Sequence, residues 1–415
     1  MVLVAKVEAK PPAQNGLRIL WILPYLPWPT TSGGKLRQYH LLKRLAEKGY
    51  RITLLIQSKV LADAETRRAL EGIVERLIVL PRRPLKHPLT LLAAAFARYP
   101  LLASVNGFSP KLTQVFGELQ VEQWDVVQIE HSYTLQPYLA LLRRVAQPFL
   151  LSEHNIESGL GAVTYQNLPG WLRSYVLYDQ WRYRCWERQA FRAARRLVAV
   201  TQEDAKRMEA IRGSAVDVVI NGVDSQYFAS VTPDVTSQRI LFVGNFEYPP
   251  NTDAVIWCIE AIMPAVWRER PDAKFVVCGY AMPTHWRERW PDERIEWLGF
   301  LPDLRTEQQR AAVFVAPLRE GGGSKLKVLE ALAAGLPLVS TSQGISGLAL
   351  DDQQFVRGDT AAALALGLVH VLGHADAARQ LGEAGRHFVS VSHDWLVAVN
   401  QLENVYRKMQ HAHWS

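Results

Sequence analysis

The stretch LRILWILPYLPWPTTSGGKLRQYHLLKRLAEKGYRITLLI (residues 17–56) contains two apolar runs separated by a helical pattern. The runs LRILWIL (17–23) and YRITLLI (50–56) have the length and the bulky apolar composition of buried β-strands. Between them, apolar residues recur at helical spacing: Leu36, Tyr39, Leu42 and Leu45. A strand, a helix and a second strand in this order predict a parallel sheet.

The same alternation continues along the chain. Further strands are predicted at 76–80, 125–130, 148–154, 196–201 and 216–221 and, after the polar stretch ASVTPDVTSQ, at 239–245, 273–279, 295–300, 313–317 and 337–341. Two successive α/β series joined by a polar linker predict two doubly wound Rossmann-like parallel-sheet domains that face each other across a cleft. We expect a disordered tail at 1–16, a first domain at 17–228 and a second domain at 229–390.

Composition limits the classes of function. The chain has 415 residues, a net charge of +7 and a pI near 9.2, which favours anionic partners such as nucleotides or acidic lipid surfaces. Its three cysteines are scattered and form no C-x-x-C pair, so we expect a reducing compartment and neither a disulfide framework nor a zinc site. The longest apolar stretch (87–105) is broken by Arg98 and Pro100, short of the roughly 18 residues of a spanning helix.

The stretch PLREGGGSKLKVLEALAAGLPLVST (317–341) raises a question of charge. Its three glycines run into a predicted helix whose first turn carries Lys325 and Lys327. A helix start is already electropositive, so cations there are unfavourable unless an anion is bound. A diphosphate at this position would receive glycine N–H groups, the helix dipole and two ammonium groups, while Glu330 would accept hydrogen bonds from ribose hydroxyls. The alternative is a solvated helix with an ion pair between Lys327 and Glu330.

Polar residues also follow several other predicted strands. In the first domain, Gly33 and Gly34 open a helix, the pair Glu130–His131 follows one strand, and His154 and Asn155 follow another. A histidine at such a place can donate to or accept from a reacting oxygen, although a tight turn and structural histidines are the alternatives. Strand ends in the second half of the chain offer further polar or flexible residues: Asn221, Gly244 and Asn245. The chain contains no D-x-D pair, so we expect nucleotide binding without a metal ion.

Two segments are basic and aromatic. Residues 81–111 carry arginines and lysines but no acid, and they are interpreted either as a membrane-surface segment or as a buried helix hairpin. In residues 171–196 aromatic residues and arginines alternate at helical spacing, which favours a long packed helix with stacking arginines over nucleic-acid binding.

Taken together, these strings resemble the retaining glycosyltransferases of the GT-B fold, and most closely glycosyltransferase family 4. The resemblance runs from about residue 17 to residue 409. Its most specific parts are SGGKLRQYHLLKRLAEKGYRITLL, AVTQED, VVINGVDSQYF, ILFVGNFEYPPN and VFVAPLREGGGSKLKVLEALAAGLPLVST. The segment SHDWLVAVNQLENVYRKM resembles the C-terminal helix of that family, so we expect residues 391–415 to pack back on the first domain.

The resemblance implies a function. The protein would transfer a sugar from a nucleotide diphosphate sugar, a UDP- or GDP-sugar, to a glycan or lipid-linked saccharide, with retention at the anomeric carbon and no cofactor or metal. It would work in the cytoplasm, with contact to the anionic inner face of the cell membrane as one option, in polysaccharide biosynthesis. Nucleic acid is not an expected partner.

The resemblance also implies roles for residues. His154, Glu320 and Lys327 would be catalytic, and Glu130, His131 and Asn155 would lie on the acceptor side. The donor would be bound by residues from both domains: Gly33, Gly34, Asn221, Gly244, Asn245, Phe300, Leu301, Glu320, Gly321, Gly322, Gly323, Ser324, Lys325, Lys327 and Glu330. Phe300 and Leu301 would lie near the base.

The sequence departs from the family pattern at two places. The family shows two glutamates separated by seven residues, and here Gly322 stands where the first is expected, so either Glu320 or glycine N–H groups replace it. Asn245–Phe246 replaces the usual basic pair after "VG", and we expect the helix lysines to compensate. A non-catalytic nucleotide-sugar-binding protein and a nucleotide-sugar epimerase or phosphorylase on the same architecture are the alternative functions.

Overall fold

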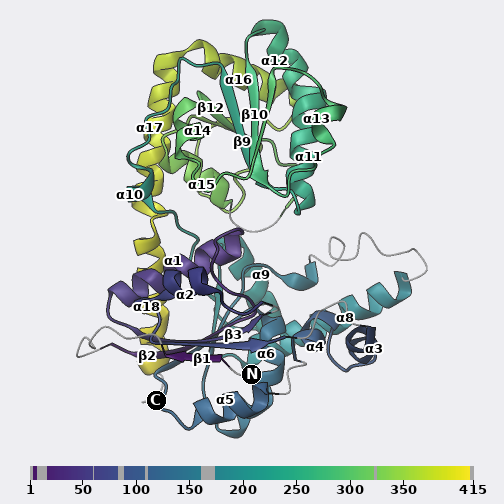
Figure 1. Ribbon diagram of the computed structural model, residues 1–415, viewed down its shortest axis with the longest axis vertical. Coiled ribbons are helices and arrows are strands. Elements are labelled where there is room, and N and C mark those ends of the chain that lie inside the picture. The colour runs from purple at the N-terminus through teal and green to yellow at the C-terminus, as the bar shows by residue number, and fades with distance from the viewer. Residues whose placement is uncertain are drawn as a thin grey trace. The chain divides into compact units, whose positions relative to one another are not determined.

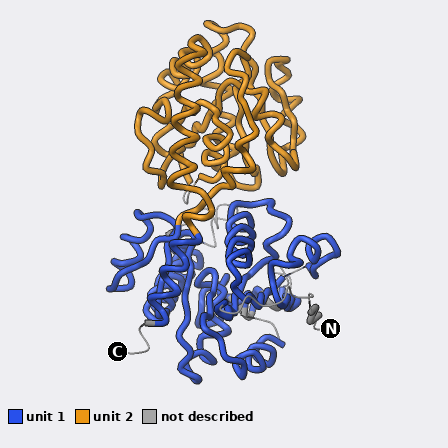
Figure 2. Tube along the Cα trace, turned by 90° about the vertical axis from the view of Figure 1, so that its left-hand side faces the viewer, with its two compact units in different colours: residues 1–219, 399–415 blue, residues 220–398 orange. Residues whose placement is uncertain are grey.

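The computed structural model describes residues 3–6, 16–58, 60–82, 88–107, 111–159, 173–321 and 325–411. The chain forms two compact units, which Figure 2 shows in different colours. Unit 1 comprises residues 1–219 and 399–415, and unit 2 comprises residues 220–398. The first division falls at 219/220, where the sequence analysis expects 228/229.

Unit 1 is built on an eight-stranded sheet with the order β1-β4-β3-β2-β5-β6-β7-β8 (Figure 1). Its strands are β1 (Leu3–Lys6), β2 (Arg18–Leu23), β3 (Arg51–Ser58), β4 (Arg76–Pro81), β5 (Val126–Glu130), β6 (Leu150–Ser152), β7 (Arg196–Ala199) and β8 (Asp217–Val218). Its helices are α1 (Gly33–Glu47), α2 (Ala64–Leu70), α3 (Pro88–Ala95), α4 (Leu101–Gly107), α5 (Leu112–Gln120), α6 (Ser132–Arg144), the 3-10 turn η1 (Glu157–Gly159), α8 (Arg173–Ala193) and α9 (Gln202–Arg212).

The strands β2 to β8 pair in parallel, as the sequence predicts. The prediction of a disordered tail over residues 1–16 is wrong for Leu3–Lys6, because these residues form β1 and pair antiparallel with β4. The short apolar run LVAK has a strand-like composition, and β4 would otherwise be an open edge of the sheet.

Unit 2 is built on a six-stranded parallel sheet with the order β11-β10-β9-β12-β13-β14. Its strands are β9 (Arg239–Asn245), β10 (Lys274–Tyr280), β11 (Ile295–Gly299), β12 (Val313–Ala316), β13 (Leu338–Ser340) and β14 (Val356–Arg357). Its helices are α10 (Ser225–Phe228), α11 (Pro249–Trp257), the π-helical segment η3 (Cys258–Ile262), α12 (Met263–Glu269), α13 (Trp286–Arg289), α14 (Arg305–Arg310), α15 (Leu326–Ala333), α16 (Ala361–Gly373) and α17 (Ala375–Ser392). The last helix, α18 (Trp395–His411), begins in unit 2, and from residue 399 on it belongs to unit 1.

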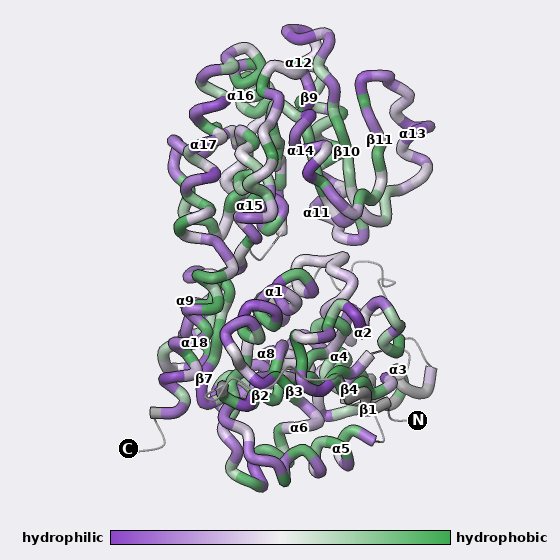
Figure 3. The backbone as a smooth tube through the Cα atoms, turned by 60° about the vertical axis from the view of Figure 1, so that its left-hand side comes forward, coloured by the Kyte–Doolittle hydropathy of each residue, from purple (hydrophilic) through white to green (hydrophobic). Residues whose placement is uncertain are grey.

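Both sheets are covered by helices on both faces, and the alternating side chains of each strand fill two cores (Figures 1 and 3). In β9, Ile240 and Phe242 pack in one core of unit 2, while Leu241 packs in the other core together with Leu329 and Leu332 of α15. Two doubly wound parallel-sheet domains are therefore confirmed.

The end of α18 packs within unit 1. The Tyr406 hydroxyl donates to Gln128 Oε1 of β5 at 2.6 Å, and Glu403 accepts hydrogen bonds from Lys48 and Tyr50. The end of the chain thus belongs to unit 1 from residue 399 on, whereas the sequence analysis expects this from residue 391 on.

The buried face of helix α1 coincides only in part with the face that the apolar pattern predicts. Its buried residues are Arg37, Gln38, Leu41, Leu42 and Leu45, whereas Leu36 and Tyr39 are only partly buried. Two polar side chains therefore occupy the buried face of the first helical turns, close to the carboxyl ends of β2 and β5.

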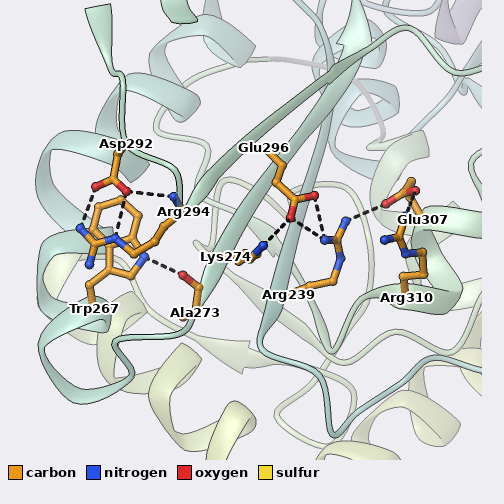
Figure 4. Close-up of polar contacts among 9 residues, drawn as sticks. All are labelled: Arg239, Trp267, Ala273, Lys274, Asp292, Arg294, Glu296, Glu307 and Arg310. Carbon is orange, nitrogen blue, oxygen red and sulfur yellow. Dashed lines mark hydrogen bonds and ion pairs between the residues drawn. The ribbon is translucent and has the colours of Figure 1, made fainter.

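The amino ends of the unit 2 strands are held by an ion-pair network (Figure 4). Arg239, the first residue of β9, donates to Glu296 of β11 at 2.7 and 2.8 Å and to Glu307 of α14 at 2.8 Å. Lys274 of β10 lies 3.4 Å from Glu296. These charges neutralise one another at the edge of the sheet opposite to the carboxyl ends of its strands, so the network has a structural role.

Among the described residues, no single helix combines the length and the apolar character that a membrane span needs. The bent pair α16–α17 meets this criterion by length and composition. In α16, Leu364, Leu368 and Val371 pack in the core of unit 2.

Gly279 of β10 allows the backbones of β9 and β10 to approach closely. A Cβ built on Gly279 would lie 1.7 Å from the carbonyl oxygen of Gly244, and the residue has φ +151°. We predict that Gly279→Ala lowers the unfolding temperature of unit 2 by about 5 °C or more, or abolishes soluble expression, because neither backbone can yield. Thermal unfolding followed by circular dichroism measures this effect.

The matched control is Gly117→Ala in α5, where a Cβ would meet no atom within 4 Å. Unchanged unfolding of Gly279→Ala would contradict the prediction.

Candidate active site

The order of the strands reverses between β2 and β5 in unit 1 and between β9 and β12 in unit 2. In doubly wound sheets, ligands bind outside the carboxyl ends of the strands at such switch points. In each unit, a cluster of buried polar groups lies at this end of the sheet. Each cluster is described here within its own unit.

The carboxylate of Glu130, the last residue of β5, is the centre of the cluster in unit 1. It accepts hydrogen bonds from Gln38 at 2.7 Å and from Gln128 at 2.6 Å, and it lies 3.1 Å from Nε2 of His154. Burial alone would raise the pKa of Glu130, but its hydrogen bond with His154 and the charges of His154 and Arg37 outweigh burial and lower the pKa to about 2. The carboxylate is therefore ionised and orients the His154 imidazole.

His154 follows β6 and has one ring nitrogen left for another partner. Because a carboxylate only accepts, Nε2 of His154 carries the proton, and Nδ1 of the neutral ring is an acceptor. Burial lowers the pKa of His154 more than Glu130 raises it, so the ring is neutral at pH 7. A Cβ built on Gly34 would lie 3.7 Å from this Nδ1 and 2.8 Å from the Tyr25 hydroxyl. Glycine at position 34 therefore keeps the backbone of α1 beside His154.

His131 directly follows Glu130 and has a strained backbone, with φ 65°. Its ring is stacked on Tyr133 at 4.9 Å and lies 4.4 Å from the His154 ring, and its Nε2 is 3.3 Å from the Tyr25 hydroxyl. Burial and the nearby His154 lower its pKa well below the usual value, so His131 is neutral. The structure thus brings Glu130, His131 and His154 together, and Asn155 follows in the same loop, partly buried.

In unit 2, both lysines of the glycine-rich stretch bind nearby acceptors. Helix α15 begins at Leu326, and Lys325 is its N-cap residue, with Nζ donating to the carbonyl oxygen of Gly321 at 3.0 Å. Lys327 Nζ donates to Asn251 Oδ1 at 2.5 Å and lies 4.4 Å from the centre of the Phe242 ring. Asn251 in turn donates from Nδ2 to the carbonyl oxygen of Asn245 at 2.8 Å.

The surroundings of Lys327 disfavour its charge. Burial, followed by the positive charge of Lys325, lowers the pKa of Lys327 to about 7. Within the described part of the chain, Lys327 forms no ion pair, and the alternative of a Lys327–Glu330 pair is wrong because the ammonium group binds Asn251 instead. A bound anion would supply the missing negative charge.

Two acidic residues lie near this helix start. Glu330 is partly buried, and burial raises its pKa to about 7, so it is able both to donate and to accept hydrogen bonds near neutral pH. Glu320 is exposed beside Arg319, whose guanidinium pairs with Asp253. Gly321 has φ +117° and is bound through its carbonyl oxygen by both Lys325 and Gln343, whereas Gly322, Gly323 and Ser324 lie outside the described residues.

The remaining predicted donor-binding residues lie at or near strand ends. Gly244 and Asn245 end β9, and a Cβ on Gly244 would lie 3.1 Å from Cβ of Asn251. Phe300 follows β11, is exposed, and meets the Tyr280 ring edge-on at 6.1 Å, with Leu301 next in the chain. Asn221 is buried in the segment that follows β8. In the described ranges, no group of three or more His, Cys, Asp or Glu residues has an arrangement that would hold a metal ion.

Comparisons with known families decide the identity of the chain. Residues 237–376 match the family described as glycosyl transferases group 1, and residues 32–223 match the glycosyl transferase 4-like domain, so the two matches span most of the chain. This chain is a group 1 glycosyltransferase.

Individual relatives agree with this assignment. The glycosyltransferase is 24% identical to a glycogen synthase of Mycobacterium tuberculosis over 94% of both chains. Among solved structures, it resembles a sucrose-phosphate synthase of Thermosynechococcus elongatus, with TM-score 0.69, 18% identity and coverage of 95% of this chain and 100% of the other. It also resembles Anabaena HepE in complex with UDP-glucose, with TM-score 0.63, 14% identity and coverage of 94% and 100%. These structures show the GT-B fold.

The sequence analysis missed several residues of the glycosyltransferase site. Gln38 and Arg37 lie on the buried face of α1 but are not part of the apolar pattern that predicts the helix, and Asn251 is not among the predicted site residues. Glu153, next to His154, is buried, accepts from the backbone N–H of Ser132 at 2.6 Å, and has a pKa raised well above the usual value by burial and by Glu187. A signal was present in the polar pair Arg37–Gln38, which precedes Leu41 and Leu42 by four residues and so shares their helix face.

The lowered pKa of Lys327 predicts a pH dependence of stability. The pKa of Lys327 is about 7 in the folded protein and near 10.5 in the unfolded chain. Between pH 7 and pH 10.5 the unfolded chain therefore binds more protons at this residue than the folded protein does. As a result, Lys327 makes the free energy of unfolding rise with pH in this range. We expect the unfolding temperature of Lys327→Met, relative to that of the unsubstituted protein, to fall as the pH is raised from 7 to 9.5. Thermal unfolding without ligand across this range measures the difference.

Lys206→Met on α9 is the control, because this lysine is exposed and lies outside the site. A difference between Lys327→Met and the unsubstituted protein that is constant with pH would refute an abnormal Lys327.

Proposed function

We propose that this glycosyltransferase transfers a sugar from a nucleotide diphosphate sugar to a glycan or a lipid-linked saccharide, with retention of the anomeric configuration and without a metal ion. The observation that carries the proposal is the pair of lysines at the start of α15. Burial lowers the pKa of one of them, Lys327, to about 7, and its side chain binds the neutral Asn251 and not an acidic residue. The complex of the similar Anabaena HepE with UDP-glucose favours a UDP-sugar, and a GDP-sugar is the second donor to test.

The role of unit 2 is to stabilise the leaving group. When the bond between the sugar and the diphosphate breaks, negative charge develops on the phosphate oxygens. Lys325, Lys327 and the first N–H groups of α15 are fixed before the reaction, so they stabilise this charge without rearranging. We assign Glu330 to the ribose hydroxyls and Glu320 or the neighbouring glycine N–H groups to the sugar.

The role of unit 1 is to orient the transferred sugar and the acceptor. Glu130 fixes the His154 imidazole so that Nδ1 is free to accept a hydrogen bond from a sugar hydroxyl. The N–H groups of Gly33 and Gly34 open α1 and are assigned to the donor phosphates. His131 and Asn155 are assigned to the acceptor side.

We also place the enzyme in the cytoplasm, in the synthesis of a cell-surface polysaccharide. The three cysteines Cys185, Cys258 and Cys278 are free thiols, which supports a reducing compartment. The strongly basic composition supports work on anionic, nucleotide-linked or lipid-linked substrates.

Substitution of His154 separates binding from transfer. We predict that His154→Ala lowers kcat for sugar transfer by about 100-fold or more while the Kd for the nucleoside diphosphate changes less than about threefold, because the imidazole acts on the sugar and not on the diphosphate. A coupled assay of nucleoside diphosphate release and calorimetric titration measure the two quantities.

His387→Ala is the control, since this histidine is exposed on α17. Full turnover of His154→Ala would reassign the histidine to a structural role. Binding of nucleotide sugars with no transfer to any acceptor, or interconversion of the sugar instead of its transfer, would support the non-catalytic and epimerase alternatives.

A further inference from the structure

The outer face of α8 carries exposed apolar and aromatic side chains. Leu177, Tyr178 and Trp181 are 59%, 49% and 57% exposed, and the rings of Tyr178 and Trp181 are stacked 6.0 Å apart. The inner face of the same helix is buried through Tyr183, Trp186 and Phe191, as expected for a packed helix. The exposed side chains are therefore not needed to hold α8 in place.

A second exposed apolar segment lies against α8. In and after α3, Leu92 and Phe96 are 59% and 85% exposed. The buried guanidinium of Arg182 donates to the carbonyl oxygens of Ala95, at 3.2 Å, and Ala97, at 2.6 Å, so it holds the residues on both sides of Phe96. Figure 1 shows α3, α4 and α8 beside one another in unit 1. The segment that carries Phe96 is therefore fastened to α8 through Arg182, the residue that follows Trp181.

The same surface is basic and carries no exposed acid. The two acidic residues of α8, Asp179 and Glu187, are buried, and Asp179 accepts from the backbone N–H of Leu101 at 2.9 Å. The exposed charges of α8 and of the α3–α4 connection are all arginines: Arg98, Arg173, Arg184, Arg188 and Arg192. Among the described residues, no carboxylate lies within ion-pair distance of any of these five arginines. The surface therefore attracts anions.

We propose that this surface, formed by Leu92, Phe96, Leu177, Tyr178, Trp181 and the five arginines, docks the protein on an anionic lipid bilayer. Exposed aromatic and aliphatic side chains next to arginines suit the boundary between headgroups and hydrocarbon, where the apolar groups insert and the arginines bind lipid phosphates. Leucine offers a nucleic acid neither stacking nor hydrogen bonds, and this favours lipid as the partner. The sequence analysis considered a membrane contact only for residues 81–111, whereas the structure adds the outer face of α8.

Vesicle sedimentation of the full chain tests the proposal without donor or acceptor, so its outcome does not depend on the proposed sugar transfer. We expect binding to vesicles of phosphatidylcholine with 30% phosphatidylglycerol, and about tenfold or greater weakening both in Phe96→Ser/Trp181→Ser and in Arg184→Gln/Arg188→Gln. Raising the salt concentration weakens binding to these vesicles, because the arginines contribute through charge. All four side chains are exposed, so the variants keep the unfolding temperature of the original protein.

Matched controls come from other exposed positions. Leu366→Ser on α16 and Lys206→Gln/Arg207→Gln on α9 remove apolar and basic groups without touching this surface, and we expect them to bind vesicles normally. Equal binding by all variants, or equal loss in the controls, would overturn the proposal. So would a protein that ignores the vesicles but binds a single-stranded oligonucleotide through the same arginines.

Discussion

The contact between Lys327 and Asn251 is the constraint on which the unit 2 site depends. An ammonium group at the start of a helix is opposed by burial, by the helix dipole and by the neighbouring Lys325, and a neutral amide oxygen compensates only in part. The protein therefore keeps a lysine in a place where its charged form destabilises the unliganded fold. Such an arrangement is understandable when a diphosphate provides the opposite charge, and the loss in stability is then recovered as binding energy.

The topology of the sheet explains why these groups meet. Asn245 and Asn251 come from the end of β9 and the start of α11, while Lys325 and Lys327 come from the segment after β12. These two strands are neighbours at the switch point, so segments some 70 residues apart in sequence form one cluster, as the 76-residue separation of Lys327 and Asn251 shows. Unit 1 repeats the arrangement, with Gln38, Glu130 and His154 gathered at the ends of β2, β5 and β6.

Much of the fold was predictable because parallel strands are buried on both faces and appear as continuous apolar runs. The strand at 239–245 was predicted to the residue, whereas β1 and the two-residue β14 were not, since such short pairings depend on an available neighbouring edge. The site was predictable where a residue type conflicts with its position, as with lysines at a helix start. Asn251 and Gln38 escaped prediction because their roles arise from contacts with residues 76 and 92 positions away.

The central claim is that the side chain of Lys327 is largely uncharged above pH 7 until a diphosphate binds. Calorimetric titration with UDP and GDP at pH 8 tests this claim most directly. Titrations in two buffers with different ionisation enthalpies give the number of protons taken up on binding. A lysine with a pKa of about 7 is mostly deprotonated at pH 8, and a bound diphosphate favours its protonated form. We therefore predict an uptake of ~0.9 proton when UDP or GDP binds, and no such uptake in Lys327→Met. Tight binding without proton uptake, or the same uptake in Lys327→Met, would contradict the account.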